Sequence, residues 1–263
     1  MKIINQEEYY QRIKKLNITH YIGEISYYIK APFRKVEKEI IKNLNPDSNI
    51  LDLGCGSGRF SINTAQLGLN VTGVDIASDV IEAAKRRAFD LKLKNVNFIV
   101  SDMTSLPFKN DTFDYIFCPR FSINAVATFE KRKKAVEEMI RLVKNDGTVF
   151  IESFNKFYLG KGIFFLLKNI IRDIKRYIVI LFYWLIKREY KGLLPGDIVY
   201  RANKVEGASN GYAHLPTIFE LRKLIPFKTR AKFYSIPQLT KEKEIDILKF
   251  FRYSIWIILQ KVD

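Results

Sequence analysis

The chain has 263 residues, of which 48% are hydrophobic and 27% charged, enough for one α/β domain with an elaboration of roughly 40 to 50 residues. It has two cysteines far apart, no signal-peptide pattern and no metal-type cluster of cysteine and histidine. This composition argues against a metal site and favours a reducing cytoplasm. The formal net charge of +16 has to be located along the chain, because a basic segment favours an anionic partner.

The positive charge is concentrated after the middle of the chain. Lys and Arg outnumber Asp and Glu by 9 to 6 in residues 1–49 and by 14 to 13 in residues 50–153. In residues 154–263 the ratio is 21 to 9, a net charge of +12. An anionic partner is therefore expected to meet the C-terminal part of the chain.

Residues 1–47 are predicted to form a helical segment that is rich in aromatic side chains. An aromatic face attracts a cation by about 0.5–2 kcal/mol, so these rings can face a positively charged ligand. Packing of an amphipathic helix is an equally good interpretation for any one of them. The aromatic residues concerned are Tyr9, Tyr10, His20, Tyr21, Tyr27 and Tyr28.

Residues 50–58, Ile-Leu-Asp-Leu-Gly-Cys-Gly-Ser-Gly, carry the strongest functional signal. A short apolar run ends at Leu53, three glycines follow at alternate positions, and a helix is predicted at 59–67. Such a unit lets a ligand lie against backbone that no side chain covers. Dinucleotide-binding loops have the spacing G-x-G-x-x-G and hold a pyrophosphate. Here the spacing is G-x-G-x-G after Asp52, which disfavours a pyrophosphate and suits a cationic ligand.

Further strands and helices alternate along the next hundred residues. Strands are predicted at 71–75, 97–102 and 113–118, and a fifth strand follows a turn at 142–147. Helices are predicted at 79–93 and 129–142. This alternation indicates a parallel sheet with right-handed crossovers, whose ligands bind outside the carboxyl ends of the strands. Three strands end there on Asp75, Asp102 and Cys118, and an acid about 20 residues past a glycine loop suits a ribose diol.

These motifs resemble those of the class I S-adenosylmethionine-dependent methyltransferases, closely over residues 48–153 and more loosely elsewhere. The resemblance implies an α/β, Rossmann-like, seven-stranded and mostly parallel sheet with helices on both faces. It also implies a helical insertion after strand five, and strands six and seven at 229–236 and 254–261. The expected parts are an N-terminal helical cap (1–47), a cofactor-binding core (48–155), a basic and apolar insertion (156–200) and the C-terminal part of the sheet (201–263).

The resemblance also implies which residues bind the cofactor, S-adenosyl-L-methionine. Asp52 would help to anchor its ammonium group, Asp75 would hold the ribose, and Asp102 would receive the adenine amino group. The full expected set is Asp52, Gly54, Cys55, Gly56, Gly58, Asp75, Ile76, Asp102, Met103 and Cys118, with the two cysteines as small fillers. The sequence at 142–147 departs from the common Leu-Lys-Pro-Gly-Gly of the family, but at no ligand position.

Three residues are candidates for contact with the methyl acceptor. Asn124 follows the fourth predicted strand, and Tyr212 and His214 begin a segment that resembles the opening of the helix before strand six. The sequence shows no paired acid and base at motif spacing. Tyr212 and His214 are therefore the candidates for a base or an orienting group, and for His214 a structural or orienting role is favoured.

The segment 156–191 combines charge with apolar runs. It holds nine basic residues against Asp173 and Glu189, a net charge of +7. Its longer apolar run, 177–186, is half of the ~20 residues that a spanning helix needs. One predicted helical face carries Ile163, Leu167, Ile170, Ile174, Ile178, Leu181 and Leu185, with Lys168, Arg172 and Lys175 away from it. This pattern favours a helix in a membrane interface; a lid packed on the domain or in a dimer, and contact with RNA, are the alternatives.

The leading hypothesis is therefore a methyltransferase acting by O- or N-methylation on a small, apolar or membrane-associated acceptor such as a quinone, lipid or isoprenoid. A tRNA-modifying methyltransferase is the second hypothesis, because the C-terminal half is basic. A cofactor-binding assembly protein without activity is a third, from another class. The expected location is the cytoplasm, with peripheral attachment at the inner membrane face, and a homodimer is an open alternative.

Overall fold

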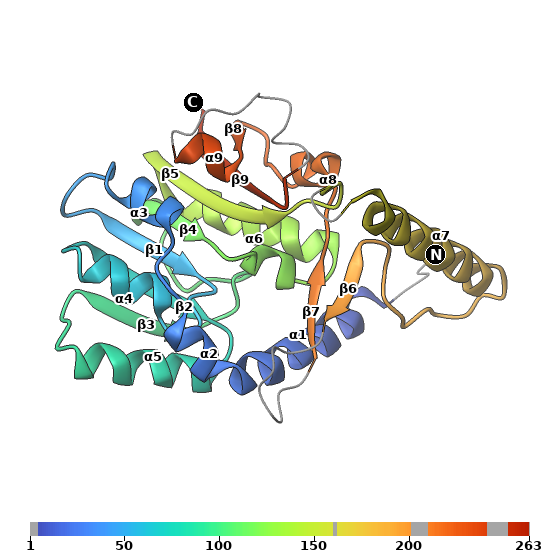
Figure 1. Ribbon diagram of the computed structural model, residues 1–263, viewed down its shortest axis with the longest axis horizontal. Coiled ribbons are helices and arrows are strands. Elements are labelled where there is room, and N and C mark those ends of the chain that lie inside the picture. The colour runs from blue at the N-terminus through green and yellow to red at the C-terminus, as the bar shows by residue number, and fades with distance from the viewer. Residues whose placement is uncertain (1–4, 160–161, 201–209, 241–251, 263) are drawn as a thin grey trace.

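The computed structural model describes residues 5–159, 162–200, 210–240 and 252–262. Its centre is a seven-stranded sheet with the strand order β3-β2-β1-β4-β5-β9-β8 (Figure 1). The strands are β1 (Asn49–Leu53), β2 (Asn70–Asp75), β3 (Val96–Val100), β4 (Phe113–Cys118), β5 (Val143–Phe154), β8 (Thr229–Tyr234) and β9 (Ser254–Lys261).

The sheet is mostly parallel, as the sequence predicted. Strand β1 pairs in parallel with both β2 and β4, and the pairs β2–β3 and β4–β5 are parallel too. Only β9 runs antiparallel to its neighbours β5 and β8. The strand order reverses between β1 and β4, so the loops that leave these two strands diverge and open a crevice at their carboxyl ends.

Helices cover both faces of this sheet (Figure 1). On one face lie α3 (Lys35–Ile41), α4 (Arg59–Ala65), α5 (Ser78–Asp90) and α9 (Ile236–Leu239), and on the other α6 (Phe129–Leu142) and α8 (Ile218–Lys223). Neighbouring strand residues alternate between the two cores. Ile116 packs on the α6 side and Phe117 on the α4 side, and both are fully buried. Burial on both faces explains why the strands read as continuous apolar runs.

The predicted turn at 142–147 is not a separate element but falls largely within β5, at an irregularity in its pairing with β4. Strand β5 begins at Val143, immediately after α6, and its register against β4 shifts between Phe113 and Tyr115. Gly147 lies at this irregularity, where an added Cβ would be 2.6 Å from the backbone oxygen of Asp114. The glycine thus serves a close approach of two strands, and the chain needs no separate turn there.

A second, two-stranded sheet, β6 (Asp197–Tyr200) and β7 (Gly211–His214), was not predicted. The helix expected to open within the segment that starts at Tyr212 begins at Ile218, where Thr217 and Glu220 form a capping box. The small sheet lies beside α1 (Gln6–Gly23), which is followed by α2 (Ile25–Lys30) in the segment that was predicted to be a helical cap (Figure 1). A short 3₁₀ helix, η1 (Ser122–Ala125), follows β4.

The insertion after β5 contains one long helix, α7 (Ile163–Leu185), at one end of the molecule's long axis (Figure 1). Its buried residues are the polar Asn169 and Asp173, while most of its apolar side chains are exposed. The alternative of a lid whose apolar residues form core does not fit the described residues of α7. Among those residues, no helix has the length and apolar character needed to span a membrane.

Asp173 holds α7 to the domain. Its carboxylate accepts bonds from Lys156 and, at 3.1 Å, from the backbone N–H of Gly196, and Arg172 and Arg176 lie at 3.4 and 3.8 Å. Removing one partner of a buried ion pair costs about 3–5 kcal/mol. We expect Asp173→Ala to expose α7 to limited proteolysis and to leave the sheet folded by circular dichroism. Unchanged proteolysis would contradict this anchoring role, and Asp79→Ala, an exposed position, is the control.

Candidate active site

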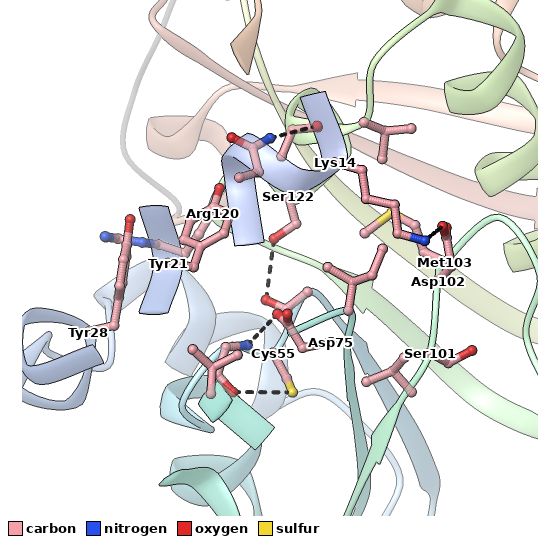
Figure 2. Close-up of a pocket in the computed structure, with 18 of the residues that line it drawn as sticks. Lys14, Tyr21, Tyr28, Cys55, Asp75, Ser101, Asp102, Met103, Arg120 and Ser122 are labelled. Atoms are coloured by element: carbon pink, nitrogen blue, oxygen red, sulfur yellow. Dashed lines mark hydrogen bonds and ion pairs between the residues drawn. The ribbon is translucent and has the colours of Figure 1, made fainter. Parts of the chain in front are cut away.

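A large cavity opens at the carboxyl ends of β1, β2, β3 and β4, beneath α1 (Figure 2). Its empty volume is about 1060 Å³, counted together with its opening to solvent. Figure 2 shows Lys14, Asp102 and Met103 at one end, Tyr21, Tyr28 and Arg120 at the other, and Asp75 and Cys55 between them. Seven of the ten predicted cofactor residues line it: Gly54, Cys55, Gly56, Asp75, Ile76, Asp102 and Met103.

The glycine loop forms part of the cavity wall, and Gly54 and Gly56 have different structural roles in it. Gly54 has φ +72°, and an added Cβ would lie 2.5 Å from Cβ and Oγ of Ser122, so only glycine fits. Gly56 has φ +53° and nothing within 4 Å of an added Cβ, which is open cavity. A ligand can therefore reach the bare backbone at Gly56.

Asp75, at the end of β2, presents its carboxylate beside this loop. Its Oδ2 accepts the backbone N–H of Gly56 at 2.9 Å, and its Oδ1 accepts that of Ala77 at 3.0 Å. Burial raises the pKa of Asp75, while these backbone bonds oppose the rise. Each oxygen keeps a further lone pair, so the side chain can accept two more hydrogen bonds, as a ribose diol requires.

Asp102 lies at the far end of the cavity and is bound by the N-terminal cap. Its Oδ2 accepts hydrogen bonds from Tyr10 Oη at 2.7 Å and from Lys14 Nζ at 3.0 Å. Its Oδ1 accepts hydrogen bonds from the backbone N–H and the hydroxyl of Thr104. Burial opposes ionisation, but these bonds hold the pKa of Asp102 below its ordinary value. An adenine amino group at Asp102 would share the carboxylate with α1.

The cavity-lining residues of α1 lie on one face of the helix. Tyr10, Lys14, Asn17 and Tyr21 follow each other at spacings of four, three and four residues. Asn17 also ties α1 down, because its amide accepts the backbone N–H of Tyr212 at 2.9 Å and donates to the carbonyl of Ala125 at 2.9 Å. The cap is thus bonded to both η1 and β7.

Asp52, Gly58 and Cys118 do not line the cavity. Gly58 (φ +77°) precedes α4, and an added Cβ there would meet Ile62 and Phe98 at 3.0 Å. Cys118 is fully buried in the core. Asp52 is also fully buried; Ser61 donates to its Oδ2 at 2.5 Å, whereas its Oδ1 has no hydrogen-bond partner. This buried carboxylate oxygen without a partner belongs to a residue two positions before Gly54, and it suits a nearby cation.

Arg120 occupies the opposite end of the cavity from Asp102 (Figure 2). It makes no ion pair with any carboxylate of the described residues, whereas the other basic residue of the lining, Lys14, is paired with Asp102. Arg120 and Phe121 have φ of +55° and +65°, conformations that cost about 1–3 kcal/mol each. Glu152 holds this backbone, accepting the N–H of Arg120 at 2.7 Å.

Glu152 is in turn fixed by a buried network. Arg34 binds both of its oxygens, at 2.9 and 2.6 Å, and Ser254 donates to it at 2.7 Å. The ring of Phe121 stacks on Phe154 with 3.8 Å between centroids. These contacts keep the strained loop in place, so Arg120 is presented to the cavity by a rigid support.

The three predicted acceptor-contacting residues lie outside the cavity lining. Asn124 is buried and donates to Ser153 Oγ at 3.1 Å and to the carbonyl of His214 at 3.0 Å. The carboxylate of Asp197 accepts hydrogen bonds from Tyr212 Oη, at 2.7 Å, and from Tyr9 Oη. His214 Nδ1 lies 2.8 Å from the same carboxylate. The structure thus gives all three buried contacts that join η1, β6 and β7, and their catalytic roles stay predictions.

Several lining residues were not predicted as site residues. Lys14, Asn17, Ser101, Arg120 and Ser122 all reach the cavity. Arg120 and Ser122 follow β4 in the stretch from which only Asn124 was selected, so the position after a parallel strand was the available signal. Lys14 and Asn17 had no such signal, because only the fold brings α1 over the sheet edge.

Comparisons with known proteins agree with this geometry. A family profile described as a methyltransferase domain matches residues 44–179, just over half of the chain. The C-methyltransferase of ubiquinone and menaquinone biosynthesis from Rickettsia prowazekii is 35% identical over 123 residues, 44% of this chain and 47% of that protein. Demethylmenaquinone methyltransferase from Renibacterium salmoninarum is 32% identical over 110 residues, 42% and 43% of the two chains.

A solved structure extends the similarity of fold. An S-adenosylmethionine-dependent methyltransferase from Methanosarcina mazei aligns with a TM-score of 0.63 at 22% identity, over 88% of this chain and 99% of that one. The chain belongs to the methyltransferase domain family, with the class I, S-adenosylmethionine-dependent fold. It spans less than half the length of the curated relatives it matches.

The residues present fit S-adenosylmethionine. Asp75 has lone pairs for a ribose diol, Gly56 leaves its backbone uncovered, and Asp52 has an oxygen without a partner for a cation. Arg120 offers a guanidinium for a carboxylate, and Asp102 offers acceptors at the other end. The cavity lining therefore has a complementary group for the ribose, the carboxylate and the adenine amino group, and the fully buried Asp52 lies behind the lining as the carboxylate for the ammonium group.

We expect affinity for S-adenosylmethionine to fall as the pH drops below 7, because burial raises the pKa of Asp52 to about 7. Only the ionised carboxylate attracts an ammonium group, so the affinity at pH 6 should be roughly eightfold lower than at pH 7.5. Calorimetric titration across this range tests the expectation. Asp52→Asn should lose the pH dependence, and a wild-type affinity that is flat with pH would contradict the role of Asp52.

The raised pKa of Asp52 affects the stability of the fold in the opposite direction. An acid whose pKa is raised by folding binds its proton more tightly in the folded protein. The contribution of Asp52 to stability is therefore fully present below its unfolded pKa of about 4 and is lost as the pH rises through 7. Asp52→Asn should consequently melt at a higher temperature than wild type at pH 8, while binding the cofactor more weakly.

Proposed function

We propose that the protein transfers a methyl group from S-adenosylmethionine to a small, apolar acceptor of the membrane-resident kind, such as a quinol, lipid or isoprenoid. The supporting observation is the shape of the cavity. Its end at Tyr21 and Tyr28, with Ile25 between them in the chain, has an aromatic and apolar lining. The cavity also opens to solvent, and its empty volume of about 1060 Å³ includes that opening, through which an acceptor can enter.

The proposed methyl transfer depends more on positioning the acceptor than on acid–base catalysis. The cofactor supplies a methyl group that its sulfonium already activates, and transfer is an in-line displacement of sulfur by the acceptor. The chain has to align the acceptor and exclude water, effects that can supply several kcal/mol. The cap formed by α1 and α2, bonded over the cavity through Asn17 and Tyr10, suits this task.

The end of the cavity near Tyr21 and Tyr28, where the acceptor is proposed to bind, has few groups that could remove a proton. Its titratable lining residues that can act as a base are Tyr21 and Tyr28, and burial raises the pKa of both, so neither ionises near neutral pH. Asp75 and Asp102 are engaged in hydrogen bonds at the cofactor end. This favours an acceptor that arrives as a nucleophile, such as a neutral amine or an electron-rich ring, over a hydroxyl that the protein must deprotonate.

The curated relatives support the apolar class of acceptor, since two of them are named for quinone methylation. They match less than half of this chain, so the acceptor atom is not carried over from them. A tRNA acceptor is the second candidate, favoured by the net charge of +12 in residues 154–263. A basic surface binds nucleic acid without sequence preference, so charge alone gives no acceptor base.

Transfer of a labelled methyl group from S-adenosylmethionine tests the proposal. The full-length protein is incubated with a prenylated quinol, with an amine-headed lipid and with unmodified tRNA, and product is measured for each. We expect transfer to one of the two apolar acceptors, and none by the Asp75→Ala variant. Transfer to tRNA alone would reject the apolar acceptor and establish the second candidate. The proposed location, peripheral at the inner membrane face, follows from the acceptor class.

A further inference from the structure

The helix α7 has its polar side turned inward and its apolar side turned outward. Its buried residues are Asn169 and Asp173, while Phe164 is 83% exposed and Leu185 63%. A helix on the surface of a soluble domain normally buries its apolar stripe against the core. Contiguous exposed apolar patches mark sites of interaction with another molecule, and this one covers the whole length of α7.

We call the exposed apolar side the outer face of α7. Its members follow each other at helical spacings of mostly three and four residues, so they form one continuous stripe. A helix of 23 residues is about 34 Å long, so the stripe is extended rather than pocket-like. The outer face consists of Ile163, Phe164, Leu167, Ile171, Ile174, Ile178, Leu181, Phe182 and Leu185, all exposed.

Buried ionic contacts fix this orientation of the helix. Asp173 is bound by Lys156 and by the backbone N–H of Gly196 at 3.1 Å. Arg176 donates to the carbonyl of Leu194 at 3.0 Å and to that of Asp197. Rotating the outer face toward the domain would break these bonds and leave the largely buried ammonium of Lys156 without its partner, which is strongly unfavourable. The apolar stripe is therefore held outward by the fold.

Basic residues border the outer face. Lys168 and Lys175 are exposed and lie seven residues apart, along one edge of the stripe, and Lys187 and Arg188 follow the end of the helix. The helix has a single acidic residue, Asp173, and it points inward. A surface that combines an extended apolar stripe with a cationic border complements an anionic lipid interface in both respects.

We propose that the outer face of α7 binds anionic phospholipid bilayers, with the helix lying in the plane of the interface. The helix is not apolar enough to span, because no candidate span exists in the described residues. A second copy of the chain suits this face less well. In an antiparallel pair of α7 helices, the row of Lys168 and Lys175 would lie against the same row of the partner, and like charges repel.

The test compares binding of the full-length protein to vesicles of phosphatidylcholine with and without phosphatidylglycerol, at low and high salt. Wild type should float with the anionic vesicles, less at high salt because surface charges are screened. The variant Lys168→Gln/Lys175→Gln should bind about thirtyfold more weakly, since each basic residue contributes about fivefold near an anionic surface. The variant Ile171→Gln/Ile178→Gln/Leu185→Gln should stay at the bottom of the gradient.

Matched variants on the opposite side of the molecule serve as controls. Lys85→Gln/Lys94→Gln removes the same charge, and Phe89→Gln removes an apolar side chain that is 83% exposed, all on or next to α5. These should bind vesicles like wild type. Every variant changes exposed residues, so folding is checked by melting temperature and by affinity for S-adenosylmethionine, which should stay unchanged. Vesicle binding and cofactor affinity are both measured without a methyl acceptor, so the outcome of this test does not depend on the proposed methyl transfer.

Three results would overturn the proposal. The first is wild type that ignores anionic vesicles at every salt concentration. The second is wild type that sediments as a dimer which the triple Gln variant loses, with no vesicle binding, since the outer face would then join two copies. The third is retention of tRNA but not of vesicles, reduced by Lys168→Gln/Lys175→Gln, which would make the border of α7 an RNA contact.

Discussion

Replacing Asp75 by alanine is expected to weaken S-adenosylmethionine binding at least about a hundredfold. Two charge-assisted hydrogen bonds to a ribose diol are lost, each contributing about 1.5–3 kcal/mol. The backbone N–H groups of Gly56 and Ala77 also lose the carboxylate that holds them at 2.9 and 3.0 Å, so the glycine loop is loosened too. Isothermal titration calorimetry measures the change directly.

Two further variants separate the contributions to this effect. Asp75→Asn keeps one acceptor oxygen and removes the charge, so its affinity should fall between wild type and Asp75→Ala. Asp79→Ala removes an exposed carboxylate outside the cavity and should bind like wild type. A folded Asp75→Ala protein with unchanged affinity would remove Asp75 from the cofactor site. NAD should not compete, because Asp52 precedes the glycine loop and disfavours a pyrophosphate.

The cofactor half of the site was predictable because its signals are local. The spacing of Gly54 and Gly56 after a short apolar strand, and acids at the ends of the following strands, are set by neighbouring residues. Parallel strands then bring their carboxyl ends to one edge, so Asp75 and Asp102 reach one cavity, as the structure shows. The sheet order and its antiparallel last strand follow from the same family motifs.

The rest of the site, at the acceptor side and under the N-terminal cap, depends on contacts between distant parts of the chain. Tyr212 and His214 were selected from their own segment, but their position depends on Asp197, which pairs β6 with β7 and binds both side chains. Asp102 was expected to be free for adenine, yet Lys14, 88 residues away, binds it. Short windows of sequence contain neither relationship, and so the acceptor end could not be assigned from them.

The helix α7 shows a different limit. Six of the seven residues of the predicted apolar face are exposed, and Ile170 is half-buried, but a period does not say which face is turned toward the domain. The structure decides this through one charged residue, Asp173, whose partners Lys156 and Arg176 fix the inward side. Arg172 and Lys175 were grouped by sequence as basic residues off the apolar face. The structure separates them, with Arg172 partly buried beside Asp173 and Lys175 exposed.

Replacing Arg120 by glutamine is expected to weaken S-adenosylmethionine binding about thirtyfold. The guanidinium lies at the end of the cavity opposite Asp102 and makes no ion pair within the described residues, so it is available to the methionine carboxylate. Truncating one partner of a charged, partly desolvated pair costs about 2–5 kcal/mol, and the lower end applies because Arg120 is half-buried. Calorimetry with wild type and variant gives the ratio.

Two ligands show whether this loss comes from the carboxylate. S-adenosylhomocysteine keeps the amino-acid portion of the cofactor, and methylthioadenosine lacks it. Arg120→Gln should lose affinity for the first and bind the second like wild type, whereas Asp75→Ala should lose affinity for both. Arg86→Gln, on exposed α5, is the charge control. If Arg120→Gln binds S-adenosylhomocysteine normally and only the KM for the methyl acceptor rises, the guanidinium contacts the acceptor. In that case the acceptor itself carries a negative charge, because the same unpaired cation would need an anion there.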